Sequence, residues 1–138
     1  MIFVLAAAIA FGAATPVDTL IERAVAIQVS LSHDKMDGVS ANATSIATDA
    51  GALGKPGEKI VAGAMALQKA KKIDEARTAF GQMSEALVAY LDAQKQKPGN
   101  GVRVAYCPMA DKPWLTKDKD IRNPYYGAAM STCGSFKK

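Results

Sequence analysis

Apolar positions recur with helical spacing through the first two-thirds of the chain. Four segments carry this pattern: residues 16–35, 39–53, 58–71 and 73–94. The last is the most regular, because its apolar residues are separated alternately by three and four positions, as in a packing seam between antiparallel helices. They are Ile73, Ala76, Phe80, Met83, Leu87 and Tyr90. Four helices joined by short loops predict an all-α fold, an up-down four-helix bundle.

The pattern changes after the glycine-rich stretch that follows the fourth segment. "VRVAYC" alternates as a strand does, but a single short strand has no evident partner. "ADKPWLTKDKDIR" resembles a charged loop, and the Asn-Pro pair after it is typical of a helix start, which predicts a short helix over 123–130. We therefore expect residues 102–134 to form an irregular C-terminal Cys/Met-rich tail. It would pack on the bundle within one domain, residues 15–138.

The N-terminus begins with an apolar run that is too short for a confident transmembrane helix. Small residues at Gly12 and Ala14 fit a cleavage site, so residues 1–14 are predicted to be a signal peptide, although a positively charged start is missing. A buried N-terminal helix is the alternative. Export predicts a periplasmic protein of the Gram-negative type, in an oxidising compartment and with no stable membrane insertion after cleavage.

Composition and charge argue against two classes of function, nucleic-acid binding and catalysis. The chain has 138 residues and a formal charge of +4, and its lysines are not interleaved with aromatic residues, so nucleic-acid binding is not indicated. His33 is the only histidine, which excludes an HExxH zinc motif and leaves no recognisable Ser-His-Asp arrangement. We predict that the protein is not an enzyme.

The two cysteines suggest a metal site because each lies close to a methionine. Cys107 and Met109 are two positions apart, which in an extended segment places both sulfurs on one side. Met130 and Cys133 are three apart, so on a helical turn they share a face. Thiolates with thioethers form a soft ligand set that selects Cu(I) and, by the same chemistry, Ag(I). His33 is a further candidate ligand.

A disulfide is the competing interpretation of the same two cysteines. Such a bridge is common in exported domains and would stabilise this one by about 3 kcal/mol. The chain would then hold no metal and would act as a structural or protein-interaction module. The spacing alone leaves both interpretations open.

The tail also resembles a known domain family. "YCPMA", "WL" and "IRNPYYGAAMSTCG" are similar to the motifs of a bacterial domain family of unknown function. That family occurs alone or fused to CusB/HlyD-type copper/silver efflux periplasmic adaptor (membrane-fusion) proteins. Arg77, Phe80 and Ser84 match the stretch that precedes the motifs, so the resemblance covers residues 76–134.

The resemblance implies a helical bundle with a sulfur-rich tail and a role in heavy-metal homeostasis or efflux. Carried over by position, it gives four candidate ligands: Cys107, Met109, Met130 and Cys133. The partners that it implies are the metal ion and a copper efflux adaptor or another periplasmic copper protein. Residues 1–138 themselves contain no segment predicted to be an adaptor domain.

Overall fold

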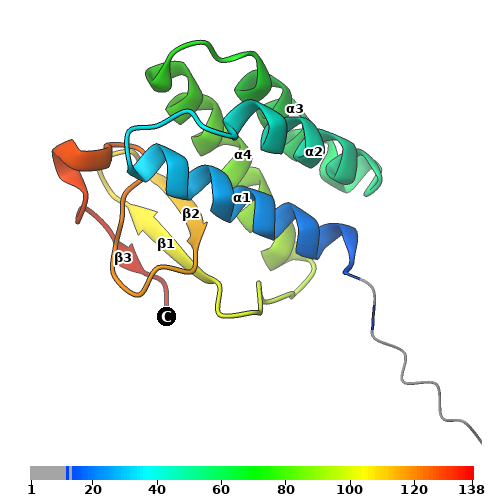
Figure 1. Cartoon of the computed structure of the whole chain (residues 1–138). Helices are drawn as coiled ribbons and strands as arrows, with labels where there is room; N and C mark the ends of the chain where they lie inside the picture. The colour runs from blue at the N-terminus through cyan, green and yellow to red at the C-terminus, as the bar shows by residue number, and fades with distance from the viewer. Residues whose placement is uncertain (1–11, 13) are drawn as a thin grey trace, which may run out of the picture.

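The computed structural model describes residue 12 and residues 14–138, and it places four helices beside a small β-sheet (Figure 1). The helices are α1 (Pro16–Ser32), α2 (Val39–Gly51), α3 (Glu58–Lys69) and α4 (Ile73–Ala93). The strands are β1 (Arg103–Cys107), β2 (Lys112–Thr116) and β3 (Ser135–Phe136), and two short 3-10 turns are η1 (Lys55–Gly57) and η2 (Gly127–Met130). The four predicted helices are confirmed, each with boundaries a few residues from those expected.

Local sequence explains where the helices begin and how closely they approach. Thr15 caps α1 through a reciprocal pair of hydrogen bonds with Asp18, and Pro16 occupies the first turn, where its missing N–H costs nothing. The apolar seam of α4 is buried around Phe80. Gly63 lets α3 approach α4 closely, because a Cβ there would lie 2.6 Å from the Cα of Met83.

The three strands form an antiparallel sheet in the order β2-β1-β3. Ala105 in the central strand pairs with Trp114 on one side and with Phe136 on the other. The sheet covers the helices on one side, where β2 packs against both α4 and α1 (Figure 1). Trp114 is fully buried in this layer.

The prediction of an all-α, up-down four-helix bundle was therefore wrong, and the fold is mixed α and β. In a closed bundle the first and last helices pack side by side. Here α1 and α4 barely touch, because β2 lies against both of them. The segment expected to be a charged loop contains β2, and "VRVAYC" finds a partner on each side.

The predicted signal peptide, residues 1–14, lies almost entirely outside the described residues. Within the described part of the chain, no helix is long and apolar enough to cross a membrane.

Candidate metal site

Cys107 is the last residue of β1 and stands at the start of a tight turn. Its side chain is fully buried, on the same side of the strand as Ala105. The backbone N–H of Ala110 points back at its sulfur, with 3.4 Å between N and Sγ. This contact holds the sulfur of Cys107 against the turn between β1 and β2.

Cys133 approaches from the other end of the tail, 26 positions away, and its sulfur lies 3.9 Å from that of Cys107. Both thiols are free in the structure. Cys133 precedes β3, whose pairing with β1 joins Tyr106 to Ser135 and brings the two segments together. The sheet that the sequence did not predict is therefore what makes the cysteines neighbours.

Asn123 holds the loop that carries Cys133. Its side chain is fully buried, and its Oδ1 accepts hydrogen bonds from the backbone N–H groups of Tyr125 and Tyr126. Its Nδ2 donates to the carbonyl oxygen of Cys133 at 2.7 Å. One amide side chain thus fixes both ends of the loop. The prediction that Asn123 caps a helix over 123–130 was wrong, because residues 124–126 form a turn and the 3-10 turn η2 after it begins at Gly127, with Tyr126 at its cap position and no side-chain cap.

Arg77 of α4 ties the same loop to the helices. Its guanidinium donates to the carbonyl oxygens of Pro124 and Leu31, and it forms an ion pair with Asp34 at 2.6 Å. Asp34 also accepts a hydrogen bond from the N–H of Ala128. The Arg77 guanidinium and this N–H hold the pKa of Asp34 below its ordinary value. Arg77 and Asp34, called the clamp below, thus join the end of α1, α4 and the loop.

Aromatic side chains form the floor beneath the loop. Tyr125 lies between Phe80 and Trp114, with ring centroids 5.7 Å and 6.0 Å away. Its hydroxyl donates to the carbonyl oxygen of Pro113 in β2, and burial raises the pKa of Tyr125. Gly134 lies so close to this floor that a Cβ there would stand 2.9 Å from the Trp114 ring.

The local environment also affects the thiol of Cys133. Burial raises its pKa, and so do the hydrogen bond and the charge of Cys107, while the backbone N–H of Met109 opposes this. Because a thiolate is the form that binds metal, a metal ion at this pair would displace a proton.

The two methionines lie at the surface beside the thiols. Met109 is 64% exposed and Met130 is 38% exposed. The expectation that Cys107 and Met109 share one side of an extended segment was wrong, because residues 108–111 form the turn between β1 and β2. The backbone N–H of Cys133 donates to the carbonyl oxygen of Met130, in keeping with the predicted turn.

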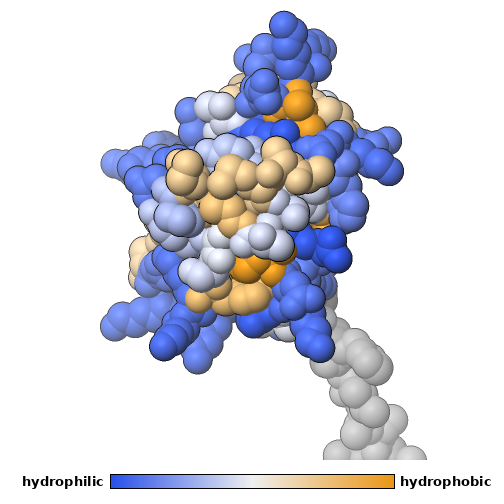
Figure 2. Space-filling view, turned by 90° about the vertical axis from the view of Figure 1, so that its left-hand side faces the viewer, coloured by the Kyte–Doolittle hydropathy of each residue, from blue (hydrophilic) through white to orange (hydrophobic). Residues whose placement is uncertain are grey.

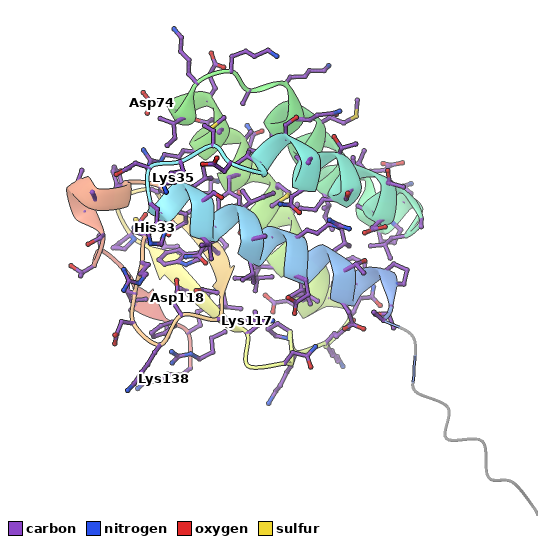
Figure 3. The ribbon with its side chains drawn as sticks, in the orientation of Figure 1. His33, Lys35, Asp74, Lys117, Asp118 and Lys138 are labelled. Atoms are coloured by element: carbon purple, nitrogen blue, oxygen red, sulfur yellow. The ribbon has the colours of Figure 1, made fainter. Side chains whose placement is uncertain are left out.

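His33 lies at the C-terminal end of α1 (Figure 3). It is exposed, and its Nδ1 lies 2.8 Å from the carbonyl oxygen of Val29. Across residues 12 and 14–138, no group of three or more His, Cys, Asp or Glu side chains is placed to hold a metal ion. His33 therefore does not join the two thiols, and the candidate donors that the structure brings together are sulfurs.

The two segments that carry the cysteines contain no charged side chain. They are residues 104–110 and residues 123–136. Figure 2 looks onto the end of the molecule that carries η2, and it shows apolar and weakly polar residues at the centre with hydrophilic residues around them. The partly exposed Met109 and Met130 belong to these two uncharged segments.

Sequence reasoning missed two contributors to the site, Asp34 and the backbone N–H of Ala110. Arg77 was noted only as part of the resemblance, and no local pattern signals its contact with Asp34 across 43 positions. The amide donor at Ala110 was detectable in principle, because the Cys-Pro pair at a strand end is typical of a turn.

No family model, curated protein or solved structure matches this chain.

Proposed function

We propose that this protein binds Cu(I), and by the same chemistry Ag(I), and that it holds or hands over the metal without turnover. The observation that carries the proposal is the pair of free thiols, Cys107 and Cys133, whose sulfurs lie 3.9 Å apart. Two thiolates are the soft donors that a monovalent soft ion prefers.

The spacing of the sulfurs suits one bridging ion. With metal–sulfur bonds of about 2.3 Å, the zinc–thiolate value, a separation of 3.9 Å corresponds to an S–metal–S angle of about 115°. That angle is nearly trigonal and leaves a third position for another donor. Met109 and Met130 are the thioethers proposed for it, because their backbones flank the thiols.

We place this activity in the periplasm and in heavy-metal homeostasis or efflux. The apolar N-terminal run and the resemblance of residues 76–134 to a family associated with copper and silver efflux adaptors support this. Proposed partners are such an adaptor or another periplasmic copper protein.

The test is a titration of the purified reduced protein with Cu(I) in the presence of a competing chelator. Free thiols are counted before and after reduction. We expect one Cu(I) per chain and two free thiols in the reduced apoprotein. A reduced protein that takes no copper from the chelator would refute the proposal. A protein purified with no free thiols and no copper affinity would support the structural, disulfide-bridged alternative.

Single substitutions separate the roles of the donors. Cys107→Ser and Cys133→Ser should each abolish competition for Cu(I). Met109→Leu and Met130→Leu should weaken binding without abolishing it. Met65→Leu is the matched control, because Met65 is similarly exposed (45%) but lies on α3. Equal affinity in all three methionine variants would remove the thioethers from the proposed site.

A further inference from the structure

We propose that Cys133 is a site of thiol–disulfide exchange with small-molecule disulfides such as oxidised glutathione, and that Cys107 is its resolving thiol. The inference rests on the two sulfurs and their unequal access to solvent. It does not require that the protein bind metal.

The two thiols differ in what can reach them. Cys107 is fully buried at the end of β1, whereas Cys133 is partly exposed in the loop before β3. In thiol–disulfide exchange, the protein thiolate must reach one sulfur of the external disulfide directly. Of the two residues, only Cys133 has solvent-exposed surface through which an external disulfide can approach the folded protein.

The same geometry favours an intramolecular second step. The sulfurs are 3.9 Å apart, so they need to approach by about 2 Å to reach the bonding distance of a disulfide. The pairing of β1 with β3 already holds the two backbones side by side. We assign the remaining approach to the two side chains, with the pairing of β1 and β3 kept.

The exchange balances in two steps. The Cys133 thiolate attacks one sulfur of the external disulfide, forms a mixed disulfide and releases one small thiolate. The Cys107 thiolate then attacks the Cys133 sulfur, forms the internal disulfide and releases the second small thiolate. The protein loses two protons and two electrons, and the external disulfide is reduced to two thiols.

This exchange would also control the proposed metal site. Metal and disulfide need the same two sulfurs, so the oxidised chain has no thiolate pair to offer. Reduction by a small thiol reverses both steps and restores the pair.

The experiment treats folded protein with oxidised glutathione and follows the intact mass. In Cys107→Ser we expect one glutathione to remain bound at Cys133, because the resolving thiol is missing. Cys133→Ser should stay unmodified when folded and react once urea exposes Cys107. The wild type should lose two hydrogens and retain no glutathione. A folded Cys133→Ser that gains glutathione as fast as Cys107→Ser would overturn the assignment.

A second measurement needs no substitution and covers the case of a variant that fails to fold. A short pulse of iodoacetamide on reduced wild-type protein should alkylate Cys133 well before Cys107, as peptide mapping reports. Equal labelling would refute the unequal access. Neither readout involves metal, so a failed copper titration leaves this inference standing and refutes only the proposed function.

Discussion

Gly134 is the residue at which the cysteine loop meets the sheet, and replacing it by alanine tests the packing described above. Its φ is 129°, a value that residues with a side chain rarely adopt. A Cβ there would lie 2.7 Å from the carbonyl oxygen of Tyr106 and 2.9 Å from the Trp114 ring. Neither neighbour yields easily, because one is strand backbone and the other is a fully buried ring. We expect Gly134→Ala to destabilise the protein.

The structure gives the size of this effect. A side chain at such a φ costs about 1–3 kcal/mol, and crowding a packed core adds about 1–3 kcal/mol. Together they lower the free energy of unfolding by about 2–6 kcal/mol. Gly99→Ala is the control, because its φ is also positive, at 67°, but nothing lies within 4 Å of its Cβ position. It should cost only about 1–2 kcal/mol.

Urea unfolding of the two variants and the wild type, all in the reduced state, measures both free energies. Gly134→Ala should unfold at a clearly lower urea concentration than Gly99→Ala. If the two alanine variants unfold at the same concentration, the contact of Gly134 with β1 and Trp114 does not contribute, and the account of how the loop is held fails.

Three further predictions concern the loop, its clamp and the core. Asn123→Ala should cost about 1–3 kcal/mol in urea unfolding, because it leaves buried backbone groups of the loop without their partners; an unchanged midpoint would contradict this. The pKa of Asp34 is lowered in the folded state by Arg77, so its contribution is present above the unfolded pKa and is lost as the pH falls through the folded value. Thermal melts of Asp34→Asn and wild type should therefore differ near neutral pH and converge well below pH 3.8; a constant difference would refute the ion-pair explanation. Met83→Ala, in the buried seam, should cost about 2–5 kcal/mol. Met65→Ala, at an exposed position, should stay within about 0.5 kcal/mol of wild type.

The helices were predictable because their signals are local. Apolar spacing and the proline at the start of α1 specify each helix within its own residues. The strands were not predictable in the same way. β2 is buried along nearly its whole length, so it shows no alternation, and it contains Pro113. Proline is tolerated there because β2 is an edge strand of the sheet. β3 has two residues and exists only through its pairing with β1.

The candidate site was predictable in its residue types but not in its shape. Sulfur chemistry identified Cys107 and Cys133, whereas their proximity depends on the register of β3 against β1, which is a non-local property. The orientation expected for Met109 was wrong because the chain turns at Pro108 instead of continuing as a strand. The position of His33 relative to the cysteines was not predictable, because a single histidine has no partner whose spacing could indicate a shared site.

Only non-covalent contacts hold the two sulfurs near each other. A disulfide between them and a metal ion bound by them would therefore each raise the free energy of unfolding. A disulfide closing the loop between positions 26 apart would stabilise the fold by about 3.5 kcal/mol in the chain-entropy model. A metal ion at one hundred times its dissociation constant would add about 2.7 kcal/mol. The two gains are of similar size, so a raised melting temperature cannot distinguish copper binding from oxidation. A Cu(I) chelator separates them, because it reverses the gain from metal and leaves a disulfide intact, whereas a small thiol reductant is itself a soft ligand and can remove both.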